Sequence, residues 1–277
     1  MNTGLQERLV LCNLDTAVRD NKGDLLSCDR WAIKLFEKMG GQLAFISGKP
    51  VHEILHQLKG SMPAESVIAC NGAVIYDGAQ GEEVKSACVH EQEARVAIQD
   101  ILLRFPSVGI EIVARGGGLY VVRSNLYVHE NLKSCKVRYL LKSLDEIPRG
   151  WLQVILRGSE EQIRKIQEHT RRKYYGARNC ICPQDANTCV ILAQNARPER
   201  AFEELCMLKG VLPRNCVLLT DDQRDLPLAQ KAGQTICSFD APPEIQQTAG
   251  RHTLSALYGG GVGEYLYGML KEYPDKV

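Results

Sequence analysis

The chain has 277 residues, 44% of them hydrophobic and 24% charged, which is the composition of an ordinary folded protein with material for one large domain or two modest ones. Its 34 basic and 33 acidic residues leave a net charge of +1 and form no strong blocks, so we expect no nucleic-acid-binding or membrane-binding surface. No apolar run approaches the ~20 residues of a membrane span. Residues 1–8 also lack the basic start and apolar stretch of a secretory signal, and we therefore expect a cytoplasmic protein.

The eleven cysteines are scattered from Cys12 to Cys237 without any C-x-x-C pair. In a reducing compartment such cysteines behave as small buried apolar residues. We therefore expect neither disulfides nor a cysteine zinc site.

The first part of the chain alternates short apolar runs with amphipathic segments. Residues 9–14 form an apolar run that ends in polar residues, which is typical of a buried strand whose C-terminal edge carries chemistry. This alternation predicts a parallel sheet with helices on both faces. The expected elements are strands over 9–14, 42–46 and 66–70 and helices over 27–39 and 51–58.

The alternation changes after residue 77, where helix patterns combine with several short strands and a turn at Gly116 to Gly118. We predict an α/β fold with a Rossmann-like parallel-sheet core, residues 1–80 and 194–277, and an inserted α+β cap domain, residues 81–193. The elements expected in the cap are helices over 91–104 and 160–174 and strands over 109–113, 119–123, 151–156 and near Cys180 and Cys189. Those expected in the returning core are helices over 199–209 and 226–232 and strands over 216–219 and 235–238.

Polar residues follow four of the predicted core strands. In open α/β sheets, ligands bind beyond the C-terminal ends of the strands. We therefore expect these residues to meet in one crevice, covered by the inserted domain. They are Asn13, Asp15, Ser47, Lys49, Asn71, Asp221 and Asp225.

Four segments at these strand ends resemble the motifs of haloacid dehalogenase (HAD) superfamily phosphatases, in particular the IIB (Cof-like) sugar-phosphatase group. Residues 45–50, Phe-Ile-Ser-Gly-Lys-Pro, resemble that group's T/S-G-R-P, and residues 71–73 resemble its N-G-A. Residues 221–227, Asp-Asp-Gln-Arg-Asp-Leu-Pro, resemble G-D-x-x-N-D-L-P. The order and spacing of the motifs extend the resemblance over nearly the whole chain.

The resemblance implies phosphoryl transfer through an aspartyl-phosphate, which requires a carboxylate nucleophile. In the family's first motif, D-x-D-G-T, the first Asp attacks, the second donates a proton and Mg²⁺ bridges nucleophile and phosphate. Asn13 stands at the nucleophile position and Asp15 at the acid/base position. Since Asn13 has no negative charge, the acyl-phosphate step is expected to fail. Taking Asp15 as the nucleophile instead leaves Ala17 in the proton donor's place.

Other positions depart from the family as well. The third-motif lysine aligns with Pro198, with Arg197 and Arg200 as the nearby cations, and Arg224 replaces the fourth-motif Asn. A more positive crevice could let a guanidinium take part of the role of magnesium, so Mg²⁺ binding is expected to be weakened or lost. The implied phosphate-binding residues are Ser47, Gly48, Lys49, Asn71, Arg197, Arg200 and Arg224, and the implied metal positions are Asp15, Asp221 and Asp225.

Two further motifs have ordinary explanations. The segment from His52 to His56 matches the H-E-x-x-H zinc pattern, but the extended pattern is absent and the phosphatase fold has a plain helix here. The run Gly259 to Gly261 is not preceded by a suitable strand, so we expect a turn rather than a phosphate loop.

Two functions follow from the sequence. The first is a catalytically impaired phosphatase-like protein, a pseudophosphatase that binds a phosphorylated small molecule or a protein partner. The second is an active Mg²⁺-dependent phosphate-monoester hydrolase acting on a phosphosugar. Ligand specificity is expected to reside in the cap.

Overall fold

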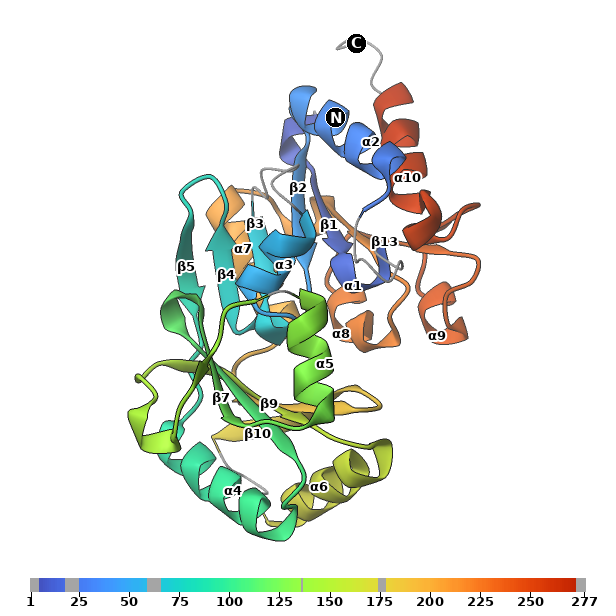
Figure 1. Cartoon of the computed structure of the whole chain (residues 1–277). Helices are drawn as coiled ribbons and strands as arrows, with labels where there is room; N and C mark the ends of the chain where they lie inside the picture. Colours follow the sequence, from blue (N-terminus) through green and yellow to red (C-terminus); the bar gives the residue numbers. More distant parts are fainter. Residues whose placement is uncertain (1–4, 18–24, 59–65, 136, 174–177, 273–277) are drawn as a thin grey trace. The chain divides into compact units, whose positions relative to one another are not determined.

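The computed structural model describes residues 5–17, 25–58, 66–135, 137–173 and 178–272. By its internal contacts the chain divides into two compact units, here called the core unit and the cap unit. The core unit comprises Met1–Lys49, Ile54–Val84 and Pro198–Val277, and the cap unit comprises Pro50–Glu53 and Lys85–Arg197. Figure 1 shows the elements of each unit in sequence colours.

The core unit is built on an eight-stranded sheet in the order β14-β13-β12-β1-β2-β3-β4-β5 (Figure 1). The pairs from β14 to β3 are parallel, and β4 pairs antiparallel with β3. Every residue of β1, β3 and β12 is buried, as expected for strands covered on both faces. The strands are β1 (Leu9–Asn13), β2 (Gln42–Ile46), β3 (Ser66–Ala69), β4 (Val74–Asp77), β5 (Glu82–Ser86), β12 (Cys216–Leu219), β13 (Gln234–Ser238) and β14 (Arg251–Thr253).

Helices pack against this sheet through apolar side chains. Phe202 and Leu205 of α7 pack with Leu11 and Leu218 of the central strands in one cluster. Helices α2 and α10 pack against each other, and the buried carboxylate of Asp29 accepts the backbone N–H of Gly263 in the first turn of α10, at 2.7 Å. The helices are α1 (Leu14–Ala17), α2 (Ser27–Lys38), α3 (Val51–Leu58), α7 (Pro198–Lys209), α8 (Leu226–Ala229), α9 (Pro243–Gln246) and α10 (Gly261–Lys271). The first three residues of α3 belong to the cap unit.

The cap unit contains a six-stranded sheet in the order β10-β11-β9-β6-β7-β8, antiparallel except for the β7-β8 pair. Helices α4 and α6 lie on one face of it (Figure 1), where Ile98, Ile166 and Trp151 belong to one buried cluster. The elements are α4 (Glu91–Arg104), β6 (Gly109–Ala114), β7 (Gly118–Arg123), α5 (Leu126–Cys135), β8 (Leu140–Leu141), β9 (Trp151–Arg157), α6 (Glu160–Lys173), β10 (Asn179–Asp185) and β11 (Thr188–Ala193).

The predicted α/β class with a parallel-sheet core is confirmed. Two predicted helices are too long, since α2 ends at Lys38 and α8 ends at Ala229. The predicted end of the helix over 160–174 lies outside the described residues. The short pairing strands β4, β5, β8 and β14 and the helix α5 were not predicted, since their sequences are short or lack an apolar period.

The predicted burial of the cysteines holds for only some of them. Six described cysteines are buried, Cys28 and Cys88 are exposed, and Cys180 and Cys182 are half-buried. Among the described helices, none has the length and apolar character needed to cross a membrane.

Candidate functional site

The register of the core sheet aligns the C-terminal ends of three strands. Asn13, the last residue of β1, pairs with Ile46 at the end of β2, and Cys12 pairs with Leu219 at the end of β12. The next residues, Ser47 and Thr220, donate their backbone N–H groups to the neighbouring strands and so stay at the same edge. Parallel pairing therefore places Asn13 and Ser47 at the same edge, as the sequence predicts, and adds Thr220 to them.

The first part of the site is a buried hydrogen-bonded group. It is formed by Asn13, Asp225 and Thr220 and is here called the amide–carboxylate pair. The Asn13 Nδ2 donates to Asp225 Oδ2 at 2.6 Å, and Thr220 Oγ1 donates to the same oxygen at 2.6 Å. The Asn13 Oδ1 accepts the backbone N–H of Asp15 at 2.9 Å, which fixes the orientation of the amide. Asn13 and Asp225 are 5% and 6% exposed, so little water competes for these groups.

Burial raises the pKa of Asp225 to about 6, and the hydrogen bonds from Thr220 and Asn13 oppose this shift. A buried carboxylate is disfavoured in its charged form unless donors or cations compensate it. Here two neutral donors, one of them the amide of Asn13, supply that compensation.

The second part of the site is an anion cradle, formed by Ser47, Gly48 and Lys49 directly after β2. Ser47 Oγ donates to Asp15 Oδ1 at 2.9 Å, and the backbone N–H of Gly48 donates to Asp15 Oδ2 at 3.1 Å. The ammonium group of Lys49 lies 3.3 Å from Asp15 Oδ1. A hydroxyl, a backbone amide and a cation thus converge on one carboxylate, and the same donor set suits a phosphoryl group.

Asn71 contacts the backbone of the cradle rather than the Asp15 carboxylate. Both Cys70 and Asn71 have left-handed backbone conformations, with φ of 52° and 54°. This turn lets Cys70 N–H donate to the Lys49 carbonyl at 2.9 Å and directs the Asn71 amide towards the Gly48 carbonyl at 3.5 Å. Asparagine tolerates this backbone region better than most residues. The side chain of Asn71 therefore contacts the loop backbone of the cradle.

Asp221 faces a different strand. Both of its carboxylate oxygens accept hydrogen bonds from Ser238 at the end of β13, from the backbone N–H at 2.7 Å and from the hydroxyl at 2.8 Å. Only its backbone N–H is directed towards the first motif, to Thr16 Oγ1 at 3.4 Å. Its carboxylate therefore holds β12 and β13 together at this edge.

The three arginines predicted as phosphate ligands have other contacts. The Arg224 guanidinium donates to both carboxylate oxygens of Asp222, with Nε at 3.0 and 2.9 Å. Arg200 lies 3.8 Å from Glu204 on the half-exposed side of α7. Arg197 belongs to the cap unit and its Nε donates to the Gln194 carbonyl at 3.4 Å.

The described carboxylates at this edge are all bonded to protein donors. Mg²⁺ demands near-octahedral coordination by oxygen atoms. Asp221 has both oxygens bonded to Ser238, Asp225 Oδ2 accepts from two donors, and Asp15 is held by the cradle. Among the residues that the structure describes, no group of three or more His, Cys, Asp or Glu side chains could hold a metal ion, and this includes the helix with His52 and His56.

Sequence reasoning missed Thr220 and Ser238, which supply hydroxyl donors to the two fourth-motif carboxylates. Each lies at or directly after the end of a core strand, so the rule that found Asn13 and Ser47 would have found them. The resemblance drew attention to charged motif residues instead.

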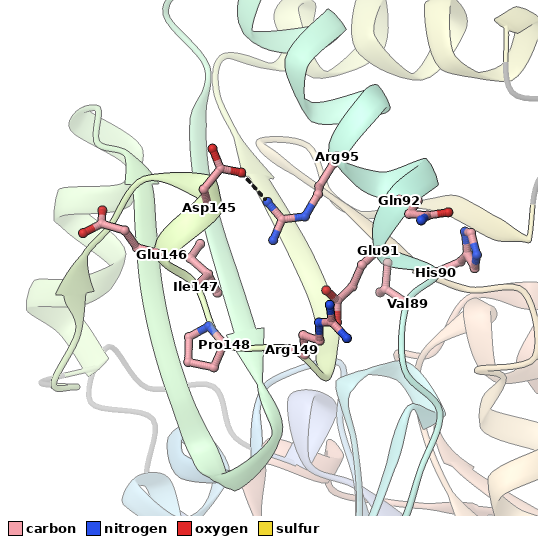
Figure 2. A pocket seen from close by; sticks show the side chains of 10 residues that line it. All are labelled: Val89, His90, Glu91, Gln92, Arg95, Asp145, Glu146, Ile147, Pro148 and Arg149. Atoms are coloured by element: carbon pink, nitrogen blue, oxygen red, sulfur yellow. Dashed lines mark hydrogen bonds and ion pairs between the residues drawn. The ribbon is translucent and has the colours of Figure 1, made fainter.

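The cap unit has a cavity of its own, of about 830 Å³, between the start of α4 and the segment 145–149. Figure 2 shows Arg95 paired to Asp145 in this space. Arg95 also lies over the ring of Trp151 at 4.7 Å, and Glu91 accepts the backbone N–H of Gly150 at 2.7 Å. These contacts join cap segments and identify no ligand.

The core unit combines a largely parallel sheet with hydrogen-bonding residues at its strand ends, and most of the cap unit is inserted between its sequence segments. The model of the haloacid dehalogenase-like hydrolase family matches residues 10–266, and the chain belongs to this family. The predicted family is therefore confirmed.

Solved structures share the fold. A protein from Thermotoga maritima has a TM-score of 0.82 and 18% identity, covering 94% of this chain and 97% of its own. A haloacid dehalogenase-like hydrolase from Bacteroides thetaiotaomicron has a TM-score of 0.82 and 16% identity, covering 95% and 99%. A sugar phosphatase of HAD subclass IIB has a TM-score of 0.78 and 15% identity, covering 95% and 98%. Comparison with curated protein sequences gives no match.

Proposed function

We propose that the protein binds a phosphorylated small molecule through the anion cradle, without magnesium and without cleaving the phosphate ester. The observation that carries this proposal is the set of donors from Ser47, Gly48 and Lys49, which already holds one anionic group, the carboxylate of Asp15. A phosphoryl group offers the same acceptor oxygens with more charge. The neighbour of subclass IIB is a sugar phosphatase, which supports a phosphosugar as the ligand class.

The loss of catalysis follows from the contacts of Asn13. A carboxylate nucleophile needs a free, negatively charged oxygen near phosphorus. The single side-chain oxygen of Asn13 accepts from the backbone of Asp15, and its nitrogen donates to Asp225. Neither atom can attack phosphorus as a carboxylate oxygen does.

Binding requires Asp15 to leave the cradle. Its carboxylate satisfies the three donors, so an incoming phosphoryl group competes with it for them. The Asp15 side chain is 21% exposed and can therefore turn towards solvent. The competition lowers affinity for weakly charged anions and favours a doubly charged phosphate monoester.

The proposal is tested by measuring phosphatase activity with Mg²⁺ for the wild type, Asn13→Asp and Asp15→Asn. Binding of inorganic phosphate is measured for the same three proteins. The proposal predicts a silent wild type that binds phosphate in the presence of a chelator. Activity that appears only in Asn13→Asp agrees with it, because the other groups are then intact. Wild-type turnover that Asp15→Asn abolishes would establish the rival, a working phosphate-monoester hydrolase. Failure of the wild type to bind phosphate would reject the cradle.

A further inference from the structure

Two thiols lie side by side on the edge strand of the cap sheet. Cys180 and Cys182 are two residues apart on β10, so their side chains lie on the same face. The S–H of Cys182 donates to Cys180 Sγ at 3.7 Å. Ile181 between them packs into the apolar cluster under α4 and α6, which fixes the strand and leaves the two sulfurs on the opposite face. Both cysteines are half-buried, and solvent reaches them.

The surroundings of Cys180 favour its ionised form. The hydrogen bond from Cys182 and the positive charge of Arg197 lower the pKa of Cys180 to about 7, against the effect of burial. The same hydrogen bond, together with burial, raises the pKa of Cys182. Near neutral pH a larger share of Cys180 is therefore ionised than of an ordinary cysteine, and the thiolate is the reactive form.

A second pair of neighbouring thiols lies in the core unit and differs from Cys180 and Cys182 in its exposure to solvent. Cys206 of α7 and Cys216 of β12 have their sulfurs 3.5 Å apart, but each residue is only 1% exposed. Their separation matches that of Cys180 and Cys182, while a reagent in solution has no access to them. The core pair therefore serves as an internal control for the effect of solvent exposure on thiol oxidation.

We propose that Cys180 is a modification site for peroxide, with Cys182 as the thiol that resolves the oxidised product. In the first step the Cys180 thiolate attacks one oxygen of hydrogen peroxide; an S–O bond forms, the O–O bond breaks, and hydroxide leaves and is protonated to water. In the second step the Cys182 sulfur attacks the Cys180 sulfur, forming an S–S bond and releasing the sulfenic oxygen as water. Two thiols and one peroxide thus give one disulfide and two waters.

The resulting disulfide is expected to be readily reduced. Strand residues two apart are separated by roughly 6.4–6.8 Å, at the upper end of the window of about 4.4–6.8 Å for disulfides. In the part of the chain that the structure describes, β10 pairs only with β11, so its other edge is held by no strand pairing. Strained, accessible disulfides are the labile ones in thiol exchange.

The test treats the reduced full-length chain with hydrogen peroxide, traps sulfenic acid with a cyclic 1,3-dione, and quantifies each cysteine by peptide mass spectrometry. At pH 7 we expect Cys180 to react roughly fivefold faster or more than the exposed Cys28 of α2. In the wild type the product is a Cys180–Cys182 disulfide that a monothiol reduces. The core pair stays unmodified until the chain is unfolded.

Variants separate the roles of the neighbours. Cys182→Ser keeps a donor but not a resolving sulfur, so trapped sulfenic acid accumulates at Cys180. Cys182→Ala and Arg197→Gln each remove one group that favours the thiolate, and both slow alkylation of Cys180 severalfold. Equal rates for Cys180 and Cys28, or a Cys182→Ser variant that yields no more trapped Cys180 than the wild type, would overturn the proposal.

Discussion

The amide–carboxylate pair and the anion cradle lie at neighbouring strand ends, and both hold a carboxylate in different ways. Asp225 is buried and held by two neutral donors, the Asn13 amide at the end of β1 and the Thr220 hydroxyl after β12. At the end of β2, Asp15 is partly exposed and held by a hydroxyl, a backbone N–H and the Lys49 ammonium. At the family's nucleophile position a neutral amide thus bonds to a buried carboxylate, while the cradle directs three donors at a partly exposed one, and the proposed function rests on this difference.

The largest expected effect comes from Asn13→Asp, which sets a second carboxylate 2.6 Å from Asp225 Oδ2. Two buried carboxylates at this distance cannot both ionise without cost. In a chelator at neutral pH we expect the free energy of unfolding to fall by about 3 kcal/mol. Chemical denaturation measures it, and added Mg²⁺ should restore part of the loss in the variant alone.

Asn13→Ala is the matched control, because it removes the hydrogen bond without adding charge. It should cost about 1 kcal/mol and show no response to magnesium. An Asn13→Asp variant as stable as the wild type in chelator would show that the amide is not what compensates Asp225.

The second effect is a pH dependence of stability. Burial raises the pKa of both Asp225 and Asp29 to about 6 from 3.8. When the pKa of a carboxyl group is higher in the folded chain than in the unfolded chain, its protonated form stabilises the fold. This stabilisation is complete at a pH below the pKa of the unfolded chain and is lost as the pH rises through the pKa of the folded chain. The free energy of unfolding should therefore fall between about pH 4 and pH 7, by on the order of 2 to 3 kcal/mol for each group.

Asp225→Asn keeps an acceptor for Asn13 and Thr220 and removes this titration. Denaturation curves at several pH values should show a flatter profile in the variant, with Asp29→Asn flattening it further. An unchanged profile in both variants would contradict the role assigned to burial.

The third effect concerns the cradle. Lys49→Ala should weaken binding of inorganic phosphate roughly tenfold, and Ser47→Ala severalfold, because each removes a donor. Asp15→Asn should strengthen binding severalfold, since the competing anion is neutralised while the side chain keeps its size. Calorimetric titration measures all three, and a weaker Asp15→Asn variant would show that Asp15 assists the anion rather than competing with it.

The smallest effect is expected at the two arginines of the core unit. Arg224 is engaged by Asp222 and Arg200 by Glu204, so Arg224→Ala and Arg200→Ala should leave phosphate affinity within about twofold. The same titration detects a larger loss, which would place a guanidinium at the bound anion as the sequence resemblance implies.

Much of the core could be predicted because buried parallel strands have continuous apolar runs, and because polar residues follow them at Asn13, Ser47 and Asp221. The short strands β4, β5 and β8 could not, since their sequences are too short or too polar for a period to show. The side-chain contacts of the site could not be predicted from the sequence motifs either. Asp221 bonds to Ser238 because β12 and β13 pair side by side, whereas Arg224 bonds to Asp222 because the two are neighbours in one turn.

The most direct test of the central claim is a calorimetric titration of the wild-type chain with inorganic phosphate, performed once in chelator and once with Mg²⁺. A metal-independent cradle predicts saturable binding with the same affinity, within about twofold, in both conditions. Binding that appears only with Mg²⁺ would contradict the account and return the site to the metal-dependent chemistry of the family.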